Sequence, residues 1–160
     1  MKRILSLALL ALALNACSPA RVTTEQVSEV AKTLDYGDYR SYTLAGKGWD
    51  ALAADDHAAV IAYTSKCVEL YGERGKNMNA GLTLFPPVEK VNDYWALNDV
   101  GTCLFIMGSS YEKLRMYPEA AAAFRSLEED FSFSQCWDPK GWYWQPAMVV
   151  AGKASKYATK

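Results

Sequence analysis

Apolar residues recur along this chain at the three- and four-residue spacing of an amphipathic helix. The first such stretch, over 27–34, follows Thr23-Thr24-Glu25-Gln26, which is typical of a capped helix start. We expect this helix to end near Tyr36-Gly37. Two longer stretches further along have the same period. The pattern therefore predicts an all-α fold.

Each of the two longer stretches is interrupted once near its middle. The first, over about 42–71, breaks at Ala54-Asp55-Asp56, where the acidic residues favour the start of a second helix. The second, over about 94–131, breaks at 115–118, where proline suits the first turn of a helix because its missing N–H has no partner there. Both stretches are therefore predicted to be helical hairpins.

The segment between the hairpins, 72–92, is expected to consist mainly of turns. It contains the residues that most often mark turns and breaks: Gly72, Gly75, Gly81 and the pair Pro86-Pro87. The alternative is an extension of the preceding helix up to Leu84.

The two hairpins are similar to each other, which indicates an internal repeat. Three pairs of residues match at one offset of 61: Ala59 with Ala120, Tyr63 with Phe124, and Leu70 with Phe131. In each copy a small residue allows two helices to approach, and the aromatic residue four positions later fills the groove beside it.

The second copy resembles the tetratricopeptide repeat, a helix-turn-helix family of 34 residues. Its first helix follows the family spacing W-x2-L-G-x2-Y with the residues Leu104, Met107, Gly108 and Tyr111. Ala120 and Phe124 then occupy the places of the family's A-x3-F, whereas Ser132 replaces the closing proline. In the first copy Ala59 and Tyr63 fit this pattern. Three further residues fit only if the length of the turn differs by one residue from that of the family: Tyr42, Gly46 and Trp49.

The resemblance implies a fold of stacked hairpins whose concave face binds proteins. First-helix residues that point away from the partner helix would line that face, and the candidates are Lys47, Asp50, Ser109 and Glu112. The alternative is a general α-helical bundle whose alanine-rich helices imitate the repeat. Both interpretations are all-α.

The N-terminus has the layout of a signal peptide. Met1, Lys2 and Arg3 provide a positive start, and an apolar run follows over 4–14. This run is about half the length that a helix needs to cross a bilayer, so we expect it to be removed.

Leu14-Asn15-Ala16-Cys17 resembles the lipobox of bacterial lipoproteins. The resemblance implies cleavage of signal peptide 1–16, lipid such as palmitate on Cys17, and a short tether over 17–22. Ser18 is not an acidic retention signal, which in that family favours the outer membrane facing the periplasm. The alternative is an ordinary secretory signal with a chance cysteine, and inner against outer membrane stays open.

Removal of the signal leaves 144 of the 160 residues, the size of one domain over about 23–160. Two basic residues leave with the signal, so 15 Lys and Arg stand against 18 Asp and Glu, for a formal charge of −3. No run rich in Lys or Arg remains. Nucleic acid is therefore excluded as an expected partner.

An aromatic segment over 131–146 follows the second hairpin. Asp138-Pro139-Lys140-Gly141 predicts a β-turn within it. The turn is flanked by the aromatic residues Trp137, Trp142, Tyr143 and Trp144. If exposed, these rings would anchor a protein or stack on sugar rings. The alternative is a cap on the repeat stack, joined by a last helix over 147–157.

The cysteines after Cys17 lack any C-x2-C spacing, and His57 is the only histidine, so we expect neither a metal site nor a cofactor. Cys67 and Cys103 are predicted to lie on adjacent helices and form a possible disulfide. Cys136 is an alternative partner for either, and buried free thiols are a further possibility.

Catalysis has little support in the sequence. A nucleophilic triad would have to use His57. A glycan-active enzyme needs two carboxylates that face each other across a cleft, and four acidic residues stay open for such a pair: Glu73, Asp93, Asp99 and Asp138. We therefore expect a non-enzymatic, membrane-anchored scaffold that binds an envelope protein. The alternative is a lipoprotein that binds carbohydrate or cell wall through the tryptophan-rich segment.

Overall fold

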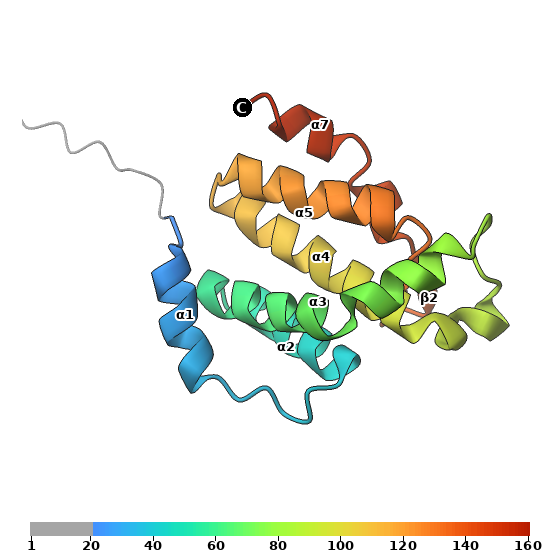
Figure 1. The fold of residues 1–160 in the computed structure, drawn as a ribbon, viewed down its shortest axis with the longest axis horizontal. Coiled ribbons are helices and arrows are strands. Elements are labelled where there is room, and N and C mark those ends of the chain that lie inside the picture. Colours follow the sequence, from blue (N-terminus) through green and yellow to red (C-terminus); the bar gives the residue numbers. More distant parts are fainter. Residues whose placement is uncertain (1–20) are drawn as a thin grey trace, which may run out of the picture.

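The computed structural model describes residues 21–160 (Figure 1). The predicted signal peptide, the lipidated Cys17 and most of the tether lie outside the described residues. The part that is described is predominantly helical, with one small two-stranded sheet, so the all-α expectation is confirmed at the level of fold class.

The first helix, α1 (Thr24–Thr33), begins as its sequence predicts. The Thr23 hydroxyl accepts a hydrogen bond from the Gln26 N–H at 3.2 Å, and the Gln26 side chain accepts one from the Thr23 N–H at 2.8 Å. This reciprocal pair satisfies two backbone donors that the helix itself leaves unpaired. The helix ends at Thr33, before the expected Tyr36-Gly37, and Tyr36 is instead buried in the core.

Four longer helices form two antiparallel hairpins that pack side by side (Figure 1). They are α2 (Ser41–Ala53) with α3 (His57–Ala80), and α4 (Trp95–Lys113) with α5 (Tyr117–Asp130). The breaks fall at the predicted places. The Asp56 carboxylate caps α3 by accepting from the Ala59 N–H, and Pro118 lies in the first turn of α5.

The turns of the two hairpins have the same backbone form. Asp55 and Arg115 both have positive φ, 54° and 58°. The next N–H then donates to the carbonyl five residues earlier, in two matching hydrogen bonds: Asp56 to Ala51 at 3.0 Å and Met116 to Tyr111 at 2.9 Å. Equivalent positions in the two turns are therefore 60 residues apart, which corrects the offset of 61 taken from the sequence.

Close helix approaches follow the same offset. An added Cβ at Gly108 would lie 2.3 Å from the Phe124 ring, and one at Gly48 would lie 3.2 Å from the Thr64 methyl group. Gly48, rather than Gly46, is thus the counterpart of Gly108. Side-chain size matches less well than position, because Leu70 is 47% exposed while Phe131, its predicted counterpart, is 1% exposed.

Helix α3 continues through Gly72 and Gly75 to Ala80, so the expected breaks at these glycines are wrong and the alternative of an extended helix is closer to the structure. Gly75 has a packing role, because a Cβ there would lie 2.7 Å from the Phe131 ring and 3.0 Å from the Ala96 carbonyl oxygen. The absence of a side chain lets α3 approach the start of α4. The predicted turns are found only after Ala80, and the short helix η1 (Val88–Tyr94) then leads into α4.

The C-terminal segment contains a β-hairpin that the all-α expectation did not include. Strands β1 (Cys136–Asp138) and β2 (Trp142–Trp144) pair antiparallel, with Trp137 opposite Tyr143. The predicted β-turn joins them, since the Gly141 N–H donates to the Asp138 carbonyl at 2.8 Å.

Two short helices follow, α6 (Pro146–Val149) and α7 (Lys153–Tyr157), in place of the single helix predicted over 147–157. Gly152 separates them with φ of 79°. Helix α7 packs on α5, where Tyr157 contacts the Phe124 ring. None of the helices within residues 21–160 has the length and apolar character needed to span a membrane.

Candidate functional site

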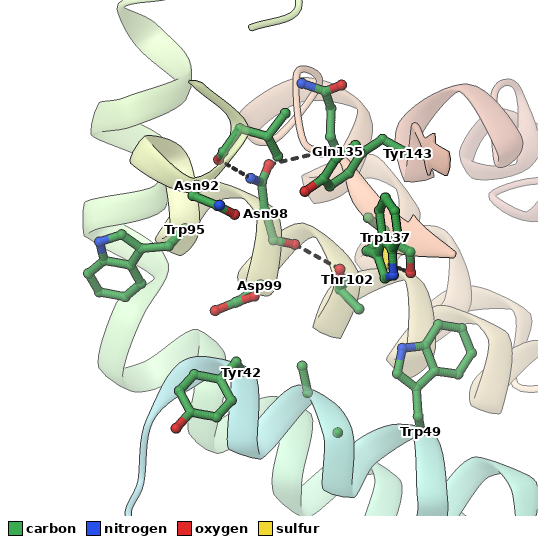
Figure 2. A pocket seen from close by; sticks show the side chains of 14 residues that line it. Tyr42, Trp49, Asn92, Trp95, Asn98, Asp99, Thr102, Gln135, Trp137 and Tyr143 are labelled. Carbon is green, nitrogen blue, oxygen red and sulfur yellow. Dashed lines mark hydrogen bonds between the residues drawn. The ribbon is translucent and has the colours of Figure 1, made fainter. Parts of the chain in front are cut away.

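A cavity of about 480 Å³ lies between α2, the start of α4 and the β-hairpin (Figure 2). We call it the aromatic groove. It is lined by Tyr42, Ala45, Gly46, Trp49, Val91, Asn92, Trp95, Asn98, Asp99, Thr102, Gln135, Cys136, Trp137 and Tyr143. Three segments that are distant in sequence therefore build one site.

Helices α2 and α4 each present one stripe of side chains to the groove. The α2 stripe is Tyr42, Ala45, Gly46 and Trp49, and the α4 stripe is Trp95, Asn98, Asp99 and Thr102. Both have the spacing i, i+3, i+4, i+7, which places residues on one face of a helix. Two adjacent helices with the same register thus form the floor.

Aromatic rings stand at both ends of this floor. Figure 2 shows Tyr42 and Trp95 on the side of Asp99, and Trp49 and Trp137 on the opposite side. Tyr42 is 58% exposed and Trp137 is 54% exposed, although both are large and partly apolar. Exposed aromatic rings around a concave site are the side chains that most often anchor a bound partner.

Rigid contacts hold the hairpin side of the groove. The Trp137 and Tyr143 rings meet edge to face at 5.0 Å, and Trp144 packs in the same way on Phe105 of α4 at 4.9 Å. Phe105 in turn lies 5.9 Å from Trp49, so one row of rings connects the hairpin to both floor helices.

Most polar side chains beneath the groove are already bound to the protein. The buried Asn98 amide donates to the Val91 carbonyl at 2.8 Å and accepts from the Gln135 N–H at 2.9 Å. The Gln135 amide donates to the Pro86 carbonyl at 2.9 Å, and the Thr102 hydroxyl donates to the Asn98 carbonyl at 2.8 Å. These bonds join the hairpin and η1 to α4, and they leave few polar groups for a ligand.

Asp99 is the exception. Its half-buried carboxylate accepts one hydrogen bond, from the Ser41 hydroxyl at 2.5 Å, and no ion pair among residues 21–160 includes it. Burial raises the pKa of Asp99, and the hydrogen bond from Ser41 opposes that rise only in part. A partly desolvated charge without a cation is costly, so it stands out in a binding site.

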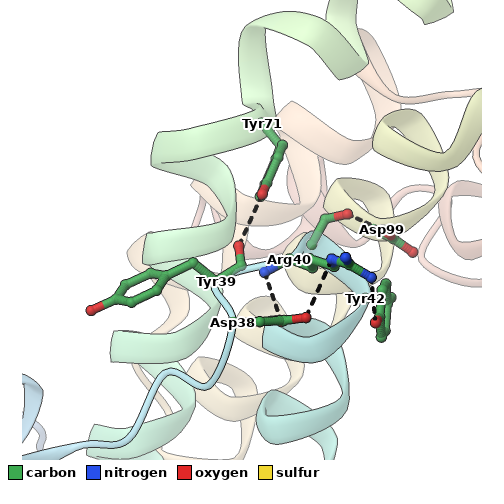
Figure 3. A network of polar contacts seen from close by, with 7 residues as sticks. Asp38, Tyr39, Arg40, Tyr42, Tyr71 and Asp99 are labelled. Carbon is green, nitrogen blue, oxygen red and sulfur yellow. Dashed lines mark hydrogen bonds and ion pairs between the residues drawn. The ribbon is translucent and has the colours of Figure 1, made fainter.

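A second cavity of about 310 Å³ adjoins the first and shares three of its lining residues: Tyr42, Trp95 and Asp99. Arg40 at its edge is fixed by Asp38, with Nε 3.3 Å from the carboxylate, and donates to the Tyr42 hydroxyl (Figure 3). This network holds Tyr42 and the segment before α2 in place. Asp99 thus lies where the two cavities meet.

Gly46 differs from the other glycines inside the helices. An added Cβ at Gly46 would meet no atom within 4 Å. Glycine inside a helix costs about 0.5–1 kcal/mol relative to alanine. No packing within the described chain offsets this cost, and the result is an open floor in the middle of the groove.

The structure divides the predicted aromatic cluster between two roles. Trp137 and Tyr143 line the groove, whereas Trp144 packs on α4 as a cap would. Trp142 is 49% exposed, and the Lys140 ammonium lies 5.9 Å from its ring centre. Because Trp137 and Trp142 are exposed, the expectation that such rings stack on sugar stays open.

None of the four residues proposed for the concave face lines the groove. Lys47 pairs with Asp35, and Glu112 binds Lys153 and Tyr157 of α7. Asp50 is exposed and Ser109 is half-buried on other faces of their helices. The groove instead uses the stripe with Tyr42, Gly46 and Trp49, the residues that fitted the repeat pattern poorly.

The residues of the repeat signature mostly belong to the core. The buried ones are Leu104, Gly108, Ala120, Phe124, Ala59 and Tyr63, and the half-buried ones are Met107 and Tyr111. They position the helices and do not form the site.

Cys67 and Cys103 lie together between α3 and α4, as predicted, but both are buried free thiols. Burial, followed by the hydrogen bond with Cys67, places the pKa of Cys103 well above its ordinary value. Cys136 is also a free thiol and lies in the groove. The disulfide therefore stays a prediction, made possible by proximity.

His57 forms a hydrogen bond through Nδ1 with the Ser110 hydroxyl at 2.8 Å. Ser110 is fully buried, so this pair links the start of α3 to α4 and presents no nucleophile to solvent. Of the four acidic residues left open for a facing pair, only Asp99 lines the groove. Within residues 21–160 no cluster of side chains suits a metal ion.

Asn98, Trp95 and Gly46 were not assigned to a binding site from the sequence, and Asp99 was named there only as one of four acidic residues open for a facing carboxylate pair. Tyr42, Gly46 and Trp49 have the spacing of one face of α2, and Trp95, Asn98 and Asp99 have that of one face of α4. The same spacing also suits a buried face. Comparisons of the chain with protein-family models, with curated proteins and with solved structures found no match.

Proposed function

We propose that this protein is a non-enzymatic, lipid-anchored scaffold of the bacterial envelope that binds an extended segment of a partner protein in the aromatic groove. The hairpins are proposed to be of tetratricopeptide type, and the groove lies on their first helices, α2 and α4, where that fold would place its concave face. Anchoring through Cys17 and a location at the outer membrane belong to the same proposal.

The observation that supports binding in the groove is its open floor at Gly46 between exposed aromatic rings. A glycine on the floor leaves room for the backbone of a bound segment to approach α2 closely. The rings at either end then provide large contact areas with little conformational freedom to lose. These features suit an elongated ligand with side chains at intervals.

A protein segment fits better than a glycan because of the hydrogen bonds beneath the groove. A sugar exposes many hydroxyl groups, and each one that is desolvated needs a partner. Three of the polar side chains that line the groove are already used within the protein: Asn98, Thr102 and Gln135. Carbohydrate binding remains the second candidate because Trp137, which lines the groove, and Trp142 on the same β-hairpin are both exposed.

Filling the groove with a larger side chain tests this proposal. Gly46→Leu places a side chain in the open floor, and Ala122→Leu adds the same side chain to the exposed face of α5 as a control. A photo-crosslinking amino acid at Tyr42 should form a protein adduct in cells, and one at the exposed Arg125 of α5 should not. Gly46→Leu should reduce the adduct at least about tenfold, a loss of about 1.4 kcal/mol of binding, while Ala122→Leu leaves it unchanged.

Equal adducts at positions 42 and 125, or an adduct that Gly46→Leu does not affect, would show that the groove is not the binding site. Binding of purified protein to chitotriose or to isolated cell wall, lost in Gly46→Leu and without any protein adduct, would favour the carbohydrate alternative.

A further inference from the structure

Asp99 is a charge without an opposite charge beside it. Its carboxylate accepts a hydrogen bond from Ser41 and lies at the junction of the two cavities. Partly buried carboxylates in proteins are usually paired with a cation or with several hydrogen-bond donors. Among the described residues, Asp99 has neither.

The cationic side chains nearest to the groove are engaged elsewhere. Arg40 is held by Asp38 and the Tyr42 hydroxyl, and the Arg74 guanidinium lies over the Trp95 ring at 4.7 Å. Within residues 21–160, no cationic side chain therefore pairs with Asp99, and the groove leaves the carboxylate open to a ligand from outside (Figures 2 and 3).

Aromatic rings adjoin this carboxylate. Tyr42 comes from α2 and Trp95 from α4, and both line the two cavities together with Asp99. The face of an aromatic ring attracts an ammonium or guanidinium group, and the attraction grows when water is excluded. A carboxylate beside such rings combines two interactions that favour the same type of ligand.

We propose that Asp99, Tyr42 and Trp95 form a subsite of the aromatic groove that takes a cationic side chain, a lysine ammonium or an arginine guanidinium, of the bound protein segment. This inference rests on the proposed function and names the chemistry of the segment. The Asp99 carboxylate pairs with the cation, the two rings flank its alkyl stem, and Ser41 keeps the carboxylate oriented.

Four capped pentapeptides test the subsite, with the sequence Ala-Ala-X-Ala-Ala and X as lysine, arginine, norleucine or glutamate. Norleucine matches the lysine stem without its charge. Binding to the purified protein is followed by tryptophan fluorescence and by NMR shifts. The lysine and arginine peptides should bind about tenfold more tightly than norleucine, and the glutamate peptide should bind most weakly.

Asp99→Asn should reduce the affinity for the lysine peptide to that for the norleucine peptide. The affinity for the norleucine peptide should not change. Asp50→Asn removes an exposed carboxylate from α2 outside the groove and serves as the matched control, with no expected change. Loss of binding to all peptides on Asp99→Asn would indicate a structural role for Asp99 and overturn the assignment.

The outcomes separate this inference from the proposed function. If lysine and norleucine peptides bind equally and Gly46→Leu abolishes both, the groove binds protein segments and the cation subsite is wrong. If no peptide binds and the crosslink at Tyr42 is also absent, the proposed function fails and the subsite fails with it.

Discussion

The two sides of the layer formed by α2 and α4 are filled in different ways. On the side of α3 and α5, Gly108 lies directly beneath the Phe124 ring, and the core is closed. On the groove side, Gly46 faces open space and Tyr42 is largely exposed. The same residue type therefore serves close packing on one side and an open floor on the other, and the open floor is what the proposed binding in the groove requires.

Removal of an aromatic ring should give the largest difference in stability between the two sides. Phe131→Ala should destabilise the protein by about 3–5 kcal/mol, because a fully buried ring is lost and a cavity remains. Tyr42→Ala should cost less than about 1 kcal/mol, because most of that ring is already in water. Urea unfolding followed by circular dichroism measures both. Comparable losses would mean that the groove side is also part of the stabilising core.

Replacement of glycine by alanine should change the stability of the protein in opposite directions on the two sides. Gly108→Ala should cost about 1–3 kcal/mol, since its Cβ would lie 2.3 Å from the Phe124 ring. Gly46→Ala should stabilise the protein by about 0.5–1 kcal/mol, because alanine favours the helix and meets no neighbour. The midpoints of urea unfolding give the two values. A destabilising Gly46→Ala would indicate an unrecognised packing role for the groove floor.

The smallest expected effect concerns the charge of Asp99. Burial raises the pKa of Asp99 above its ordinary value of 3.8, so the folded state binds a proton more tightly than the unfolded chain. This tighter proton binding stabilises the folded state. The stabilisation is fully present at pH values below the ordinary pKa and is lost as the pH rises through the pKa of the folded state.

Asp99→Asn removes the ionisation and should make the protein slightly more stable than the wild type at pH 7, while cation binding is lost. The gain should shrink as the pH is lowered, which thermal unfolding at several pH values measures. A destabilised Asp99→Asn variant at pH 7 would show that the carboxylate serves folding instead of binding.

The local signals in the sequence predicted most of the helices and their turns. The Thr23 capping pair, the acidic start of α3, Pro118 at the start of α5 and the β-turn at 138–141 all act within a few residues, so their effects can be inferred without the rest of the chain. The errors were of a different kind. Gly72 and Gly75 were predicted to break a helix, but the approach of α3 to α4 requires a small residue at Gly75.

The register of the repeat shows the same limit. Small and aromatic residues matched at an offset of 61, while the turns and the close helix contacts are equivalent at 60. A match of residue types survives a shift of one residue in the alignment of the two hairpins. A helix turns by about 100° for each residue, so the same shift changes which side chains face the neighbouring helix. The contact candidates Lys47 and Glu112 were also placed wrongly, since they pair with Asp35 and Lys153 outside the groove.

The sequence by itself determined most helix starts, the all-α fold class and the closing aromatic segment, because these depend on hydrogen bonds and periodicity within short stretches. The ends of α1 and α3 lie elsewhere than predicted. Only the tertiary structure decided which face of each helix is buried. It alone brought Asp99 and Trp95 of α4 beside Tyr42 of α2, because this arrangement depends on distances between residues that are far apart along the chain.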